Sequence, residues 1–261
     1  MSIWPRDPSA HRYLVRLGWG IPARSGTKPV FRFRRCRTQG GRAETRWSGP
    51  AEDAAVSDAS QDTHSLRRAF FLAAFFVGLL WLIKLVELLF SLDLSQLSIF
   101  PRRFETLPGI ALAPLLHGSL SHLFANTAPI LVLGTLLIYG YPKAARILLP
   151  ALYLGSGLGV WMFARPAWHL GASGLTFGMM FFLFTMGILR WDRRAIALAL
   201  VAFLLYGGTI WGIFPIAPNI SFEYHLFGAG IGILLALRLK GLDPAPPRKR
   251  YSWEGEDAKD E

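Results

Sequence analysis

Six stretches of mostly apolar residues follow one another from Ala69 onward, separated by short polar segments. They cover approximately 69–92, 115–140, 147–164, 173–190, 195–214 and 222–239. Most are close to the ~20 residues that a helix needs to cross a bilayer. Backbone groups in lipid must be hydrogen-bonded within the protein, so helices are expected here and not strands. The pattern therefore predicts an all-α polytopic membrane protein with six transmembrane helices.

Lys and Arg gather in alternate connections between these stretches. They precede the first stretch, separate the second from the third and the fourth from the fifth, and follow the sixth. By the positive-inside rule, this predicts that both termini are cytoplasmic. The first outer loop, 93–114, is an exception because it carries Arg102 and Arg103. Its mixture of apolar, basic and proline residues predicts a structured segment at the membrane surface, partly re-entrant.

The segments outside the six stretches are polar. We expect residues 1–65 to form a basic, disordered N-terminal cytoplasmic region and residues 241–261 a charged, disordered cytoplasmic tail. The first thirty residues lack a continuous apolar core, which predicts no cleavable secretory signal. Their Arg-rich, acid-poor composition is compatible with a transit peptide, an upstream-extended gene start or a disordered tail.

Composition narrows the class of protein further. The chain has 261 residues, is 52% hydrophobic and carries a formal net charge of +11. A basic flank beside apolar spans marks a cytoplasmic membrane face, and no nucleic-acid-binding motif accompanies it. The single cysteine, Cys36, excludes an intrachain disulfide and any multi-cysteine metal site. We expect no metal or other cofactor and no nucleic-acid partner.

Ionisable side chains within membrane spans are costly, so each is a functional candidate. Lys84 and Glu87 are three residues apart in the first span. This spacing puts them on one helical face, where they are expected to form a local ion pair or to extend toward the membrane interface.

Polar residues also mark the start of the second span. His122 and Asn126 are four residues apart, which places them within about 40° of each other on one helical face. Their side chains can therefore aim donors at one point. His117, five residues before His122, is expected on the turn that enters this helix.

The fourth and sixth spans suggest a nucleophile and a base. Ser173 lies in the sequence "GASGLTFG", and His225 begins the sequence "HLFGAGIG". Gly174 and Gly178 lie on one face of the fourth span, and Gly228 and Gly232 lie on one face of the sixth, so the two helices can pack closely enough for Ser173 and His225 to meet. A free serine is a poor nucleophile and needs such a base. Gly-Ala-Ser-Gly alone is weak evidence, but its combination with the ordered histidines and Asn126 is far more specific.

These residues resemble those of the rhomboid intramembrane serine proteases, in the bacterial form with six transmembrane helices. The resemblance covers about Leu66 to Leu239 and rests on "HGSLSHLFAN" (117–126), "GASGLTFG" (171–178) and "HLFGAGIG" (225–232). The loop sequence "FPRRFETLPGI" is also similar to that of many bacterial members. The resemblance implies a rhomboid-like bundle in residues 66–240.

The resemblance assigns the chemistry of the site. Ser173 matches the nucleophile, and His225 matches the general base that later protonates the leaving amine. His122 and Asn126 match the side chains credited with stabilising the oxyanion, helped by the backbone amide of Ser173. Glu223 lies near His225, but a dyad of the family type does not need it.

The resemblance also assigns supporting residues. Gly171 matches the glycine that keeps the approach to the serine open, and Phe177 matches the aromatic residue on which the base stacks. His117 matches a further histidine near the mouth of the site, with a structural or hydrating role. Many relatives have a Trp-Arg pair in the first outer loop, where this chain offers Arg102 or Arg103.

The expected function is that of an intramembrane serine endopeptidase in a bacterial inner membrane. It would cleave transmembrane segments of single-pass membrane proteins, in contact with membrane lipid, through an acyl-enzyme. A catalytically silent rhomboid-like protein that binds transmembrane clients is the alternative, although a pure binder has no chemical need for both Ser173 and His225. A small transporter or channel is disfavoured because the sequence shows no repeated half.

Overall fold

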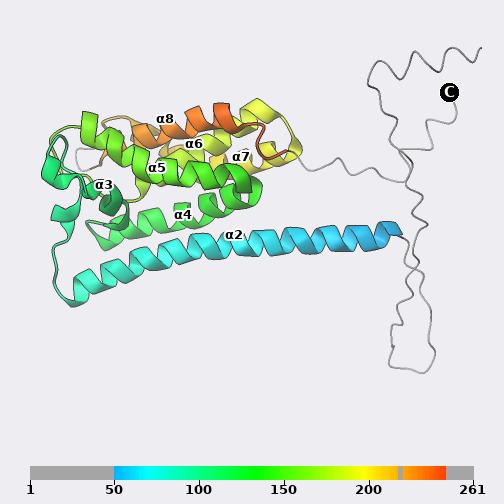
Figure 1. The fold of residues 1–261 in the computed structure, drawn as a ribbon, viewed down its shortest axis with the longest axis horizontal. Coiled ribbons are helices and arrows are strands. Elements are labelled where there is room, and N and C mark those ends of the chain that lie inside the picture. The colour runs from blue at the N-terminus through cyan, green and yellow to red at the C-terminus, as the bar shows by residue number, and fades with distance from the viewer. Residues whose placement is uncertain (1–49, 217–219, 245–261) are drawn as a thin grey trace, which may run out of the picture. The chain divides into compact units, whose positions relative to one another are not determined.

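The computed structural model describes residues 50–216 and 220–244, and within them the fold is built from helices (Figure 1). The long helices are α2 (Pro50–Leu89), α4 (Leu120–Gly140), α5 (Pro142–Phe163), α6 (Ser173–Arg190), α7 (Arg193–Tyr206) and α8 (Phe222–Leu239). The short ones are η3 (Ser95–Leu97), η4 (Phe104–Thr106), α3 (Gly109–Leu112), η5 (Ala113–Leu115) and η6 (Gly207–Ile213). The described residues contain a single isolated β-bridge, between Ile99 and His169.

Six segments in the described part of the chain are long and apolar enough to cross a membrane, which confirms the predicted fold class. They are Ser65–Leu89, Leu120–Gly140, Pro142–Phe163, Ser173–Arg190, Arg193–Ile213 and Phe222–Leu239. The fifth consists of α7 and η6 in succession. Apolar length alone therefore located all six spans to within a few residues.

Three helices begin at polar residues that cap them. The side chain of Ser119 accepts a hydrogen bond from His122 N at the start of α4, and Asp192 accepts one from Ala195 N at the start of α7. Ser221 does the same for α8. Such side chains satisfy backbone amides that have no partner within the helix. These caps fix where α4 and α8 begin, and therefore where their polar first turns lie.

Helix α6 is the most buried of the six membrane spans and packs closely against α8. A Cβ atom added at Gly228 would collide with the carbonyl oxygen of Gly174, and one added at Gly232 would collide with that of Gly178. The two glycine faces thus allow backbone to touch backbone, as the sequence predicted. This contact sets α8 directly beside the start of α6 (Figure 1).

The segment between α2 and α4 is structured, as predicted, and it holds the loop that precedes α6. Ile99 and His169 exchange backbone hydrogen bonds of 3.1 and 2.8 Å, and Gly171 N donates to the carbonyl of Ala113 at 2.9 Å. The side chain of Arg102 donates to the carbonyl of Ala164 at 2.9 Å, at the end of α5. The first outer loop is therefore part of the support for the loop at 164–172.

The structure differs from expectation at the edges of the predicted bundle. Helix α2 begins at Pro50, so helical backbone extends into the region 1–65 that was expected to be disordered. After α8, the carboxylate of Asp243 accepts hydrogen bonds from Lys143 N at 3.0 Å and Ala144 N at 2.8 Å. Arg190 also donates to the backbone carbonyl of Asp243. The start of the segment 241–261 is therefore ordered, because Asp243 caps the N-terminus of α5. Residues 1–49 and 245–261, which were also expected to be disordered, lie outside the described residues.

Candidate active site

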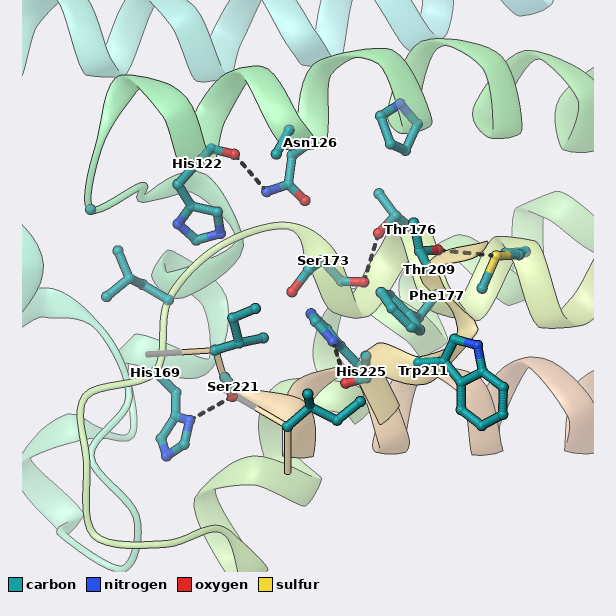
Figure 2. Close-up of a pocket in the computed structure, with 18 of the residues that line it drawn as sticks. His122, Asn126, His169, Ser173, Thr176, Phe177, Thr209, Trp211, Ser221 and His225 are labelled. Atoms are coloured by element: carbon teal, nitrogen blue, oxygen red, sulfur yellow. Dashed lines mark hydrogen bonds between the residues drawn. The ribbon is translucent and has the colours of Figure 1, made fainter. Parts of the chain in front are cut away.

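A cavity of about 1090 Å³ lies among α4, the loop at 164–172, α6, η6 and α8. It is lined by five of the residues that the sequence singled out: His122, Asn126, Ser173, Phe177 and His225. Figure 2 shows the side chains of these residues facing a common space from three different helices. The cavity therefore brings together groups that are more than a hundred residues apart in the chain.

Ser173 is the first residue of α6, so its backbone amide is one of those without a helical partner. Its carbonyl accepts a hydrogen bond from Thr176 Oγ1 at 2.8 Å, which anchors the first turn (Figure 2). The positive end of the helix dipole lies at this turn. A negative charge that develops beside Ser173 would therefore meet unpaired amides and a favourable potential.

His225 lies in the first turn of α8, and its ring is held by two contacts. The imidazole stacks on the ring of Phe177, with centroids 4.0 Å apart and an interplanar angle of 5°. Its Nδ1 lies 2.8 Å from the carbonyl oxygen of Gly212 in η6. Because a carbonyl only accepts, Nδ1 carries the proton when the ring is neutral, and Nε2 keeps its lone pair. This is the tautomer that a base acting through Nε2 requires.

No hydrogen bond joins the Ser173 hydroxyl to the His225 imidazole in this structure, although both groups line the cavity. Such contacts are often looser in the absence of substrate than in the reacting complex. The glycine at position 212 matters for this arrangement. A Cβ atom there would lie 2.9 Å from Phe177 Cζ and 3.1 Å from His225 Nδ1. Gly212 therefore lets the backbone approach the base closely.

His122 and Asn126 lie on consecutive turns of α4, above the serine in Figure 2. One amide hydrogen of Asn126 is used, because Nδ2 donates to the carbonyl of His122 at 3.0 Å. The second amide hydrogen remains for a partner in the cavity. Gly171 packs against the His122 ring, and a Cβ atom there would lie 2.7 Å from His122 Cε1. Gly171 also has φ +113°, a conformation that other residues rarely adopt.

His117 does not line the cavity but lies directly behind His122. The two rings meet edge to face, with centroids 5.1 Å apart. The His117 ring is buried, and neither of its nitrogens has a hydrogen-bond partner among the described residues. Burial lowers the pKa of His117 to about 4, with His122 and Lys84 acting in the same direction and the Leu115 carbonyl opposing them. His117 is therefore neutral at pH 7.

The predicted ion pair in the first span is confirmed. Lys84 Nζ lies 3.0 Å from Glu87 Oε2, and the lysine is buried. Lys84 Nζ also donates to the backbone carbonyl of His117 at 2.9 Å. The first span is thus connected to the turn that leads into α4.

His169, which lies beside the site, was not singled out from the sequence. His169 Nδ1 lies 2.6 Å from Ser221 Oγ, and His169 Nε2 lies 3.1 Å from the carbonyl of Arg165 (Figure 2). Burial lowers the pKa of His169, so the ring is neutral at pH 7. These bonds join the loop before Ser173 to the cap of α8. The pairing depends on tertiary contacts, so no sequence spacing signals it.

The acidic residue near the base is occupied elsewhere. Glu223 Oε1 lies 3.5 Å from Arg165 Nε and accepts from Arg165 N at 3.3 Å. The group that holds His225 Nδ1 is instead the backbone carbonyl of Gly212. In the part of the chain that the structure describes, no three His, Cys, Asp or Glu side chains are grouped as a metal site.

The sequence of this chain is similar to those of a known protein family. Residues 105–241 match the family model described as Rhomboid domain. Uncharacterized protein Rv1337 of Mycobacterium tuberculosis is 36% identical over 183 residues, which is 67% of this chain and 75% of that protein. Uncharacterized protein ML1171 of Mycobacterium leprae is 31% identical over 186 residues, covering 67% of this chain and 71% of the relative.

Proposed function

Because this chain belongs to the rhomboid family, we propose that it is an intramembrane serine endopeptidase with Ser173 as nucleophile and His225 as base. The chain is an integral membrane protein, and the family consists generally of serine proteases that act in the membrane. The observation that best supports activity in this member is the setting of His225. Its Nδ1 is bound to Gly212 O, and its ring is stacked on Phe177 in the cavity that Ser173 lines.

In the first step, Ser173 Oγ attacks the carbonyl carbon of the scissile peptide bond. His225 Nε2 takes the hydroxyl proton, and the imidazolium that forms keeps its Nδ1–H bond to Gly212 O. The tetrahedral intermediate then collapses, the C–N bond breaks, and His225 gives its proton to the leaving amine. Water next attacks the acyl-enzyme with His225 again as base, which releases the acid product and restores Ser173.

The oxyanion is stabilised by donors around the start of α6. The Ser173 amide, the free amide hydrogen of Asn126 and the ring of His122 face the region where this charge develops. In a cavity shielded from bulk water, donors that are already oriented lower the barrier more than they would in water. Gly171 supports this role because a side chain at this position would collide with the His122 ring and displace it.

The substrate in this proposal is the transmembrane segment of a single-pass membrane protein, with lipid as the surrounding solvent. A helix hides its carbonyl groups, so the segment unwinds locally before Ser173 attacks. The protein in this proposal lies in a bacterial inner membrane, and the distribution of Lys and Arg supports both termini in the cytoplasm. In that orientation, the cavity opens toward the outer side of the membrane.

Labelling with a fluorescent fluorophosphonate tests this proposal without a known substrate. The purified protein should be labelled, and the Ser173→Ala and His225→Ala variants should not, at unchanged melting temperature. Ser121→Ala is the matched control because Ser121 also lines the cavity but is exposed and bonded to Ser119. Labelling that persists in folded Ser173→Ala, or none in the wild type, would count against a reactive dyad and favour a client-binding rhomboid-like protein.

A further inference from the structure

Lys84 is a buried lysine within the first membrane span, which is an expensive place for a positive charge. Its side chain does not extend to the surface, since only 8% of it is exposed. The ammonium group binds Glu87 Oε2 at 3.0 Å and the His117 carbonyl at 2.9 Å. Glu87 balances the charge, but the ammonium group has three donors, and the His117 carbonyl accepts from a second one.

The His117 carbonyl belongs to the turn that leads directly into α4. The edge-to-face contact of the His117 ring with His122 has centroids 5.1 Å apart, and Gly171 also packs against the His122 ring. An unbroken line of contacts therefore runs from Lys84 through His117 to His122. Within the Lys84–Glu87 ion pair, it is the positively charged ammonium group that binds His117. The positive charge is therefore the one nearer to His117.

We propose that Lys84 is a positioning residue for His122 in the oxyanion site, acting through His117 by its hydrogen bond and its charge. This inference rests on the proposed function. The hydrogen bond fixes the turn from which His122 projects, and the charge favours the neutral form of His117. In a low-dielectric setting, the same charge adds a favourable potential for a nearby anion. The charged and titratable groups around the ammonium are Glu87, His117 and His122.

A purely structural role for Lys84 makes a different prediction. One turn away on α2, Trp81 joins that helix to α4 itself, because its Nε1 donates to Thr127 Oγ1 at 3.1 Å and its ring contacts Phe124. If α2 only needs to be tied to α4, loss of the Trp81 bond should slow the reaction as much as loss of Lys84. If Lys84 acts through His122, only the lysine should matter for the rate.

The test measures fluorophosphonate labelling over a range of probe concentrations, together with thermal unfolding. Removing a direct oxyanion donor slows catalysis by about 10²–10³-fold, so a residue that acts through the donor should cost less, about tenfold. We expect Lys84→Met to lower the maximal labelling rate by that factor and to leave the half-saturating probe concentration unchanged. Lys84→Arg should recover most of the rate, and Trp81→Phe should react like the wild type.

A second variant protects the test against misfolding. Lys84→Met leaves Glu87 as an unpaired buried charge, whereas the double variant Lys84→Met, Glu87→Leu removes both charges and should fold. We expect the double variant to remain slow. A wild-type rate in either folded variant, or an equal loss in Trp81→Phe, would overturn the role of Lys84 while leaving the proposed function intact. A wild type that does not react at all would instead remove the proposed function, and this inference with it.

Discussion

Replacing Gly212 by alanine perturbs the base of the proposed dyad without touching a reacting group. The new Cβ atom would lie 2.9 Å from Phe177 Cζ and 3.1 Å from His225 Nδ1, both shorter than ordinary van der Waals contact. The backbone of η6 or the stacked rings must therefore move apart. The contact that gives way most directly is the 2.8 Å hydrogen bond from His225 Nδ1 to Gly212 O.

The magnitude follows from the charge that this bond supports. When His225 takes the serine proton, the bond becomes one from an imidazolium, and a hydrogen bond to a charged group contributes about 1.5–3 kcal/mol. Loss of that amount in the transition state corresponds to a rate reduced about 10- to 150-fold. Alanine in a helical position is itself more favourable than glycine by about 0.5–1 kcal/mol. We therefore expect slow fluorophosphonate labelling in a protein whose melting temperature changes little.

Gly208→Ala is the matched control for this prediction. Gly208 lies in the same η6 segment, and a Cβ atom added there meets nothing within 4 Å. Both substitutions replace a glycine of η6 by alanine, but only Gly212→Ala disturbs the base. Equal labelling rates for Gly212→Ala and the wild type would refute the role of the Gly212 carbonyl. Equal slowing by the two variants would point to the flexibility of η6 instead.

Three further predictions concern stability and can be followed by thermal unfolding in detergent. Gly228→Ala should destabilise the protein by about 1–3 kcal/mol because its Cβ collides with the Gly174 carbonyl, whereas Gly230→Ala, which has open space, should not; equal effects would contradict the close packing of α6 and α8. Asp243→Ala should cost about 1 kcal/mol through loss of the cap on α5, and an unchanged melting temperature would contradict that role. The folded-state pKa of His117, about 4, lies below its ordinary 6.5, so the unfolded chain binds its proton first as the pH falls. Stability should therefore be full above pH 6.5 and decline by roughly 3 kcal/mol toward pH 4, and His117→Gln should flatten this part of the profile; an unchanged slope would show that another group is responsible.

The architecture could be predicted from sequence because it depends on regular, local patterns. Apolar length located the six spans, and the glycine spacing around Gly174 and Gly228 predicted that α6 and α8 meet. The four-residue spacing of His122 and Asn126 put both on the cavity side of α4. Each of these inferences needs only the geometry of a single helix and the requirement that polar groups avoid lipid.

The contacts that support the site could not be predicted in this way. The Gly212 carbonyl holds the base through its backbone, and a backbone group leaves no signal in the choice of residue type. Lys84 was recognised as an ion-pair partner of Glu87, but its bond to His117 connects positions whose separation in the sequence has no period. Asp243 caps a helix that begins a hundred residues earlier, so its polar surroundings suggested only a tail.

The proposed function requires Ser173 to cut a peptide bond inside a membrane span. The direct measurement is to reconstitute the wild type and Ser173→Ala into liposomes with solubilised single-pass membrane proteins of a bacterial membrane, and to identify new chain termini by mass spectrometry. We expect new termini within the apolar segments of a few proteins, present with the wild type and absent with Ser173→Ala. If wild-type protein that reacts with fluorophosphonate produces no such termini, or if Ser173→Ala produces the same ones, the proposed activity is wrong.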